Sequence, residues 1–260
     1  MGGCCSCKQE LRFKRLVNAC YPKDEDAAVD LVPRDAIGRL NVYILHNPER
    51  IPRVCRKLKK LLDGAIAGHA VRRVQHTVFI LRELLEGVSK AAGVVAGPGA
   101  HSVDLIDFYV PSVVDMSLGL LALRDSELRI AGADLISILT LQLVDTTQAV
   151  QGGSGPGGFG GVAAGSEQSW RRVVAGHSAN LIACLSGMCT EGINTTSIDA
   201  LHVRYASLVA IGNVTASLVG CGPDGSDDLL VTVLQGYLSL CKSPYRIGGS
   251  APLLVALRLD

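Results

Sequence analysis

Apolar residues recur every three or four positions over most of the chain beyond residue 35, which is the spacing of one face of an α-helix. In one segment, Ile51, Val54, Leu58, Leu61 and Leu62 form such a stripe. The same spacing predicts helices over 36–47, 50–63, 69–92, 102–123, 126–150, 169–188, 197–220, 227–241 and 251–260. No alternation of period two bounded by hairpin turns recurs, so the pattern predicts an all-α chain.

The expected helices have similar lengths, one apolar face each, and short connections rich in Gly, Pro, Ser and Asp. Such units cannot bury their apolar faces alone, so they stack on their neighbours. We therefore expect an armadillo/HEAT-like α-α superhelix of stacked helical hairpins. A compact helical bundle is the rival, although eight or nine helices exceed what one bundle core needs. The expected divisions are an anchor segment (1–34), helical repeats (35–150), a Gly-rich linker (151–168) and further repeats (169–260).

The tract GGSGPGGFGG (152–161) raises the question of a phosphate-binding loop. A P-loop needs G-K-[ST] after the glycines, whereas VAAGSEQ follows here. A dinucleotide fingerprint follows a strand, and the residues before this tract are helical in pattern. The tract is therefore interpreted as a linker between helical hairpins.

Charge is balanced over the 260 residues but unevenly distributed. Residues 1–90 hold 17 Lys and Arg against 10 Asp and Glu, and residues 91–260 hold 8 against 14. A basic N-terminal third favours an anionic partner, either a membrane surface or nucleic acid. Because no nucleic-acid module or aromatic interleaving accompanies the basic residues, no nucleic-acid partner is expected.

Three of the nine cysteines lie in the first seven residues, MGGCCSC. No paired spacing elsewhere completes a zinc site, and a signal peptide's apolar stretch is missing from residues 8–15. Thiols at a chain end beside basic residues indicate S-acylation of Cys4, Cys5 and Cys7. MGGCCS also fits the pattern for myristoylation of Gly2. One acyl chain holds a protein on a membrane only marginally, whereas two chains, or one chain and a basic patch, hold it stably.

Two basic clusters accompany these thiols. The first is Arg12, Lys14 and Arg15, and the second spreads over PERIPRVCRKLKKLLDG (48–64). Glu49 and Asp63 are the only acids flanking the second cluster, so little neutralises it within the helix. A solvated helix face is the alternative interpretation; we favour contact with acidic phospholipid, at about 1 kcal/mol per cation. The candidate phospholipid-binding residues are Arg12, Lys14, Arg15, Arg50, Arg53, Arg56, Lys57, Lys59 and Lys60.

Nothing in the sequence predicts a catalytic site. The six histidines do not cluster, and no G-x-S-x-G nucleophile motif occurs. We therefore expect no enzymatic activity, no metal site and no cofactor.

Several blocks, in order, resemble the Eighty-Five-Requiring (Efr) family of plasma-membrane scaffolds, the Rolling Blackout-like proteins. These blocks are MGGCCSC, RFKRLV (12–17), Tyr21-Pro22, GRLNVYILHNPERIPRVCRKLKKLL (38–62), DFYVPSVVDM (107–116) and SELRIAGADLISIL (126–139). Together they cover about residues 1–150. The chain is shorter than the family's members and ends within an expected helix, as a fragment of a longer scaffold would.

The resemblance implies a non-enzymatic helical rod, S-acylated on its cysteine cluster and lipid-bound through a basic surface. It also implies a location on the cytoplasmic face of the plasma membrane. There the scaffold is expected to recruit the type III alpha phosphatidylinositol 4-kinase complex through its tetratricopeptide-repeat adaptor, supporting phosphatidylinositol 4-phosphate synthesis. The alternative is another lipidated armadillo-type adaptor for protein partners.

Overall fold

The structure, a computed structural model, describes residues 5–95, 102–152, 167–190 and 198–218. Within these ranges every regular element is helical and no strand occurs, which confirms the all-α prediction. The helices are α1 (Cys5–Ala19), α2 (Arg34–His46), α3 (Ile51–Ala67), α4 (Val71–Val95), α5 (Ser102–Asp107), α6 (Val110–Leu121), α7 (Ser126–Gly152), α8 (Glu167–Thr190) and α9 (Ile198–Leu218).

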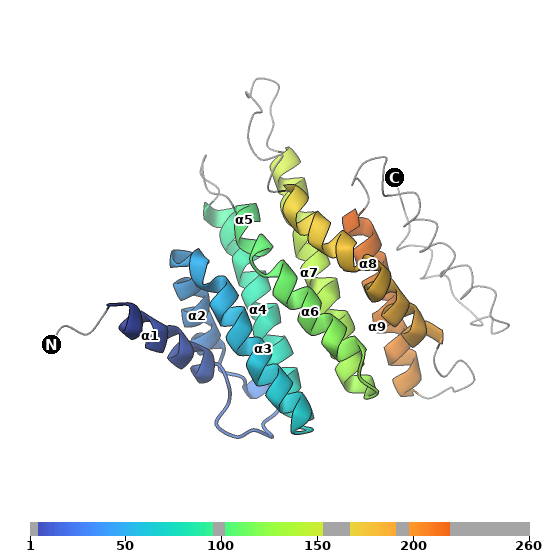
Figure 1. Cartoon of the computed structure of the whole chain (residues 1–260), viewed down its shortest axis with the longest axis horizontal. Coiled ribbons are helices and arrows are strands. Elements are labelled where there is room, and N and C mark those ends of the chain that lie inside the picture. Colours follow the sequence, from blue (N-terminus) through green and yellow to red (C-terminus); the bar gives the residue numbers. More distant parts are fainter. Residues whose placement is uncertain (1–4, 96–101, 153–166, 191–197, 219–260) are drawn as a thin grey trace.

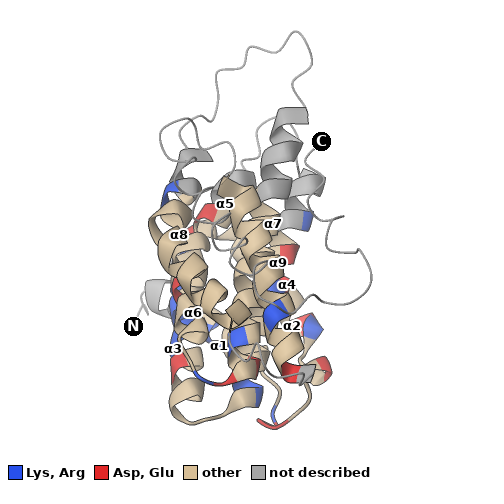
Figure 2. Cartoon of the chain, turned by 90° about the vertical axis from the view of Figure 1, so that its right-hand side faces the viewer, with Lys and Arg blue, Asp and Glu red and all other residues tan. Residues whose placement is uncertain are grey.

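The helices pair into antiparallel hairpins that stand side by side along the long axis of the molecule (Figure 1). The pairs are α1 with α2, α3 with α4, α6 with α7, and α8 with α9. In one layer α3 contacts α6 and α6 contacts α8, and in the other α2, α4, α7 and α9 follow one another in contact. Figure 2 shows the two layers edge-on. This arrangement is the predicted superhelix of stacked hairpins.

One apolar core runs through the described part of the stack, from Phe13 in α1 to Leu218 in α9. Each helix contributes the stripe that its sequence spacing predicts. In α3, for example, Ile51, Val54, Leu58 and Leu62 are all buried. Burial of such stripes between neighbouring hairpins is the main stabilising term, because each fully buried Leu, Ile or Val contributes about 1.5–3 kcal/mol.

The prediction of a single helix over 102–123 is wrong, because α5 ends at Asp107 and α6 begins at Val110. Pro111 has no N–H to donate to the helix turn before it, and proline disfavours a continuing helix. The backbone N–H of Tyr109 instead donates to the carbonyl of Ile106 at 2.8 Å, which closes α5 with a tight turn. A new helix then begins at Val110, with the proline in its first turn, where no hydrogen bond is lost.

Helix α1 lies inside the expected anchor segment, 1–34, in which no helix was predicted. Its residues Phe13 and Val17, together with Cys20 just beyond its end, are buried against the first hairpins. Their spacing of three and four residues is a helical stripe, too short to be noticed among the surrounding charges. The segment 1–34 therefore includes a structural part of the stack.

The glycine-rich tract separates α7 from α8 in sequence, and its residues 153–166 lie outside the described part of the chain. The helices on either side nevertheless pack together, since α8 contacts α6 and α9 contacts α7. The repeats before and after the tract thus belong to one stack. The helices predicted over 227–241 and 251–260 lie outside the described residues.

Candidate membrane-facing surface

Helix α1 is attached to the body of the stack through its C-terminal half. Val17 and Cys20 are fully buried and Phe13 is 4% exposed, where α1 packs against α2 and α3. On the outer side, the guanidinium of Arg12 lies over the ring of Tyr43 in α2, 5.9 Å from its centroid. Because α1 is continuous from Cys5 to Ala19, its first residues are joined to the packed half by unbroken helix.

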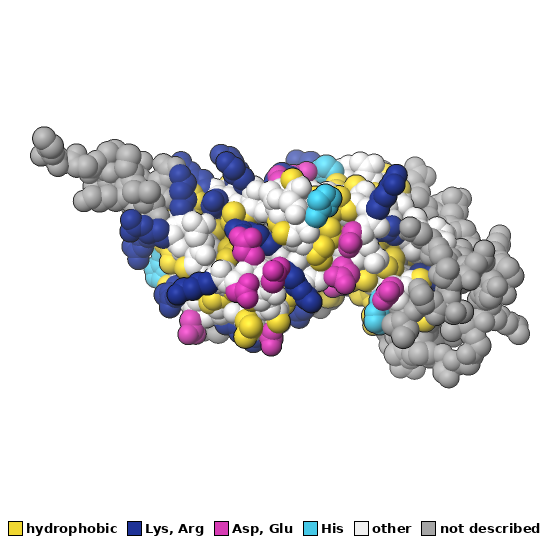
Figure 3. All heavy atoms as spheres, turned by 90° about the horizontal axis from the view of Figure 1, so that it is seen from below, with side chains coloured by type: hydrophobic (Ala, Val, Ile, Leu, Met, Phe, Trp, Pro, Cys, Tyr) yellow, Lys and Arg dark blue, Asp and Glu magenta, His cyan; other side chains and the backbone are white. Residues whose placement is uncertain are grey.

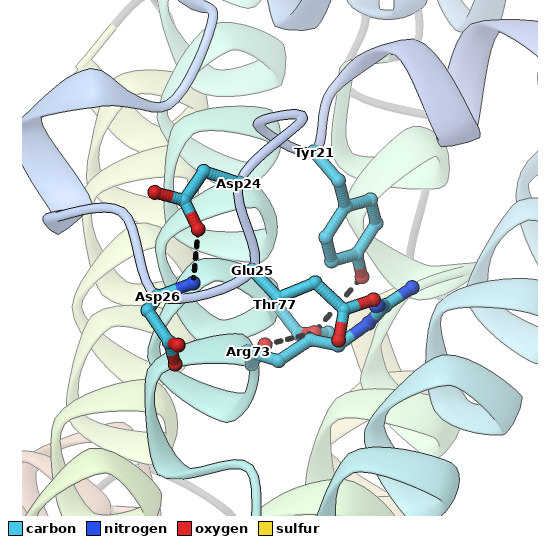
Figure 4. A network of polar contacts seen from close by, with 6 residues as sticks. All are labelled: Tyr21, Asp24, Glu25, Asp26, Arg73 and Thr77. Atoms are coloured by element: carbon cyan, nitrogen blue, oxygen red, sulfur yellow. Dashed lines mark hydrogen bonds and ion pairs between the residues drawn. The ribbon is translucent and has the colours of Figure 1, made fainter.

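The segment that follows α1 is bound to α4 by the polar network drawn in Figure 4. Thr77 donates its hydroxyl hydrogen to the carbonyl of Arg73 at 2.9 Å, so its oxygen is left to accept one from Tyr21 at 2.8 Å. Burial raises the pKa of Tyr21 to about 12, which keeps the phenol protonated as that donor. Arg73 stacks over the Tyr21 ring and pairs with Glu25. A buried His76 holds the carbonyl of Ala27 through Nε2 at 2.8 Å.

Helix α3 presents the second basic cluster on the side opposite its buried stripe. Arg53, Arg56 and Lys60 are exposed, three and four residues apart, and therefore share one face. Lys57 beside them is half-buried. No ion pair within the described residues neutralises the three exposed cations.

The expectation that acids leave this cluster unneutralised is wrong for two of its members. Lys59 pairs with Asp115 of α6 at 3.0 Å and with Asp63 at 3.7 Å. The hydrogen bond to Asp115 raises the pKa of Lys59, so the lysine stays positively charged. That charge is paired across the contact between α3 and α6. Arg50, in the short turn before α3, pairs with Glu49. Asp115 is distant in sequence, so helical spacing alone could not reveal this pair.

Basic side chains gather at the N-terminal end of the molecule. Figure 3 shows Lys and Arg concentrated over the first hairpins, with acidic side chains further along the stack and between the cations. Within α1, Arg12, Lys14 and Arg15 are all exposed. Candidate cations from α1 and α3 thus lie on two helices that pack against each other.

Two of the four predicted lipidation residues, Cys5 and Cys7, belong to α1. The backbone of Cys5 and Cys7 forms the first turn of the helix, and Gly2 and Cys4 lie outside the described residues. The sequence analysis put these thiols at a chain end, in a segment without a predicted helix. The structure places Cys5 and Cys7 on a helix whose other half belongs to the core.

The interior cysteines have a different environment. Cys20 and Cys55 are fully buried, and loss of hydration raises the pKa of each thiol from 9.0 to about 12. Burial also raises the pKa of Cys189, whose sulfur lies 2.9 Å from the Ser207 hydroxyl. Because the thiolate is the reactive form, these thiols are chemically inert in the folded chain.

Two further features of the described residues concern metal binding and membrane crossing. No group of three or more His, Cys, Asp or Glu side chains is arranged to hold a metal ion there. One stretch, Arg172–Thr190 in α8, is long and apolar enough to cross a bilayer by length and composition. Its Val174, Leu181 and Leu185 are buried in the stack, as in a core helix of the same composition.

Comparison with known proteins found no matching protein family, no similar curated protein and no similar solved structure.

Proposed function

We propose that this chain is an acyl-anchored peripheral scaffold on the cytoplasmic face of the plasma membrane. It carries no catalytic activity of its own. It localises the type III alpha phosphatidylinositol 4-kinase complex through the tetratricopeptide-repeat adaptor of that complex, and so supports phosphatidylinositol 4-phosphate synthesis.

The observation that carries the membrane part is that two kinds of membrane signal lie on neighbouring helices of the first two hairpins. Candidate acylation sites stand on the first turn of α1, and exposed cations stand on α1 and on the neighbouring α3. Acyl chains and a basic surface reinforce each other in membrane binding. The kinase part rests on the resemblance of residues 1–150 to the Eighty-Five-Requiring family.

Removal of the leading thiols tests the anchor in the full-length chain. The triple change Cys4→Ser, Cys5→Ser and Cys7→Ser is expected to move the protein from the membrane pellet to the cytosol, as is hydroxylamine, which cleaves thioesters. Cys184→Ser, at a half-buried cysteine of α8, is the matched control and keeps the protein in the pellet. Retention of the triple variant on membranes would contradict acyl anchoring.

Recruitment is tested separately from anchoring. The wild-type chain is expected to capture the kinase adaptor, and its removal from cells to lower phosphatidylinositol 4-phosphate at the plasma membrane. Normal anchoring without either effect would reject the kinase part and leave the membrane part standing.

A second function, as a lipidated adaptor for another protein, is favoured by one surface of α9. Leu201, Tyr205 and Val209 follow one another at intervals of four residues, and all are exposed, Tyr205 at 71%. An exposed apolar row on a helix is a typical contact surface for a protein partner. A different partner captured by the wild-type chain, and lost with Tyr205→Glu, would support this function over kinase recruitment.

A further inference from the structure

The chain from Phe108 through α6 carries an exposed row of side chains beside the exposed cations of α3. Members of this row follow one another at intervals of three or four residues: Phe108, Pro111, Asp115, Gly119 and Ala122. The cations of α3 form a row of the same spacing: Arg53, Arg56 and Lys60. The two helices are neighbours in one layer of the stack (Figure 1).

Two contacts align the two rows. One is a hydrogen bond between the Ser112 hydroxyl and the Cys55 thiol, and the other joins Lys59 to Asp115 at 3.0 Å. The order of these contacts shows that α3 and α6 run in the same direction, with their beginnings together. The side chains of Lys59 and Asp115 are 39% and 62% exposed, so this pair bridges the two rows at the surface. Phe108, four residues before Ser112, therefore lies beside the beginning of α3.

Phe108 is unusual among the phenylalanines that the structure describes. It is 43% exposed, whereas Phe13 is buried and Phe79 is half-buried beneath the guanidinium of Arg34. One exposed apolar ring is ordinary on a protein surface. The three α3 cations beside it, which no ion pair within the described residues neutralises, indicate a partner that is both anionic and apolar.

A bilayer with anionic lipid offers both features at one surface, because its charged headgroups overlie apolar acyl chains. We propose that Phe108 and Pro111 enter this interface while the α3 cations contact the headgroups. The acids of α3 and α6, Asp63 and Asp115, both pair with Lys59 and so do not face the headgroups as free carboxylates. The inference rests on the proposed membrane anchoring, to which it adds an apolar contact, and it does not involve the kinase.

Tryptophan fluorescence can report which side of the stack enters a bilayer. The chain has a single tryptophan, Trp170, which is 1% exposed and therefore gives a constant background. Phe108→Trp, in the full-length acylated chain, places a second tryptophan at the proposed contact. Leu141→Trp is the matched control, because Leu141 is 44% exposed on α7, in the opposite layer of the stack.

Each protein is mixed with vesicles of phosphatidylserine and phosphatidylcholine whose acyl chains carry bromine, which quenches tryptophan at contact range. Phe108→Trp should lose part of its added emission and shift to shorter wavelength, whereas the wild-type chain and Leu141→Trp should keep theirs. Absence of quenching in Phe108→Trp, or equal quenching in both variants, while the protein floats with the vesicles would overturn the inference and leave acyl anchoring standing. A wild-type chain that does not float with the vesicles would instead reject the proposed anchoring, and the inference with it.

Vesicle affinity gives a second measurement, without an added tryptophan. Phe108→Ala should weaken binding of the acylated chain to the same vesicles by about tenfold, because the apolar area of the ring is no longer removed from water. Leu141→Ala should leave binding nearly unchanged, and circular dichroism on the same samples checks that both variants are folded. Binding of Phe108→Ala as strong as that of the wild-type chain would show that the ring does not enter the bilayer.

Discussion

Cys20 and Cys55 show what burial in the core does to a thiol. Cys20 and Cys55 are fully enclosed by apolar side chains, and their raised pKa follows from loss of hydration. The sequence shows nine cysteines but does not distinguish the buried ones from the leading three by composition. Their position relative to the helical stripe does: Cys20 continues the Phe13–Val17 row, and Cys55 follows Val54 in α3.

The thiol environment predicts a reactivity difference. With a pKa near 12, Cys20 and Cys55 are about one part in ten thousand thiolate at pH 8, against roughly a tenth for a thiol at the ordinary pKa of 9.0. Iodoacetamide labelling read by peptide mass spectrometry should therefore be at least about a thousandfold slower at these two residues than in the urea-unfolded chain. Labelling at the unfolded rate in the native protein would show that these thiols are accessible.

The sign of the pH effect follows from the same values. Folding holds these thiols neutral, so their contribution to stability is fully present below pH 9. It decreases as the pH rises from about 9 towards 12, because the unfolded chain can then release protons that the folded chain retains.

At the scale of elements, the close approach of α6 and α7 depends on one glycine. A Cβ on Gly132 would lie 2.9 Å from the Cβ of Leu120 and 3.1 Å from the carbonyl oxygen of Ser117. Neither neighbour is the free end of a flexible side chain, so the two helices would have to separate. Gly132 lies in the SELRIAGADLISIL block. Its lack of a side chain allows α6 and α7 to approach each other closely.

Gly132→Ala should therefore destabilise the fold, although alanine is the better helix former. Overpacking costs about 1–3 kcal/mol and exceeds the gain in helix propensity of up to about 1 kcal/mol. Gly176→Ala in α8 is the matched control, because nothing lies within 4 Å of its added Cβ. In urea unfolding, the control should gain up to about 1 kcal/mol in free energy. A stabilised Gly132→Ala variant would show that α6 and α7 are not closely packed.

Sequence spacing predicted most helices because their apolar stripes are long and regular. It failed for α1, whose stripe of three buried residues is surrounded by cations, and at Pro111, where the stripe continues through a break in the backbone. It also could not find the contacts that join distant segments. The Tyr21–Thr77 hydrogen bond and the Lys59–Asp115 pair each link helices or loops more than fifty residues apart.

At the scale of the whole molecule, the stack separates the basic end from the rest of the chain. The exposed cations Arg53 and Arg56 stand on α3 near the start of the stack, whereas Arg124 and Arg172 are exposed further along it. Proteins that bind an anionic bilayer by one end should respond to the position of a charge as well as to its sign. Two double variants can therefore be compared that have the same net charge but lose their cations at different places in the fold.

Arg53→Gln with Arg56→Gln should weaken binding of the full-length chain to phosphatidylserine vesicles by about thirtyfold, since two cations contribute about 1 kcal/mol each. The control pair, Arg124→Gln with Arg172→Gln, should leave binding nearly unchanged. Raising the salt concentration should weaken vesicle binding by the wild-type chain. It should also reduce the difference in binding between the wild-type chain and the α3 variant, because salt screens the charge contacts that this variant has already lost. Equal loss in the two pairs would mean that total charge attracts the protein to the membrane, without a defined basic face on α3.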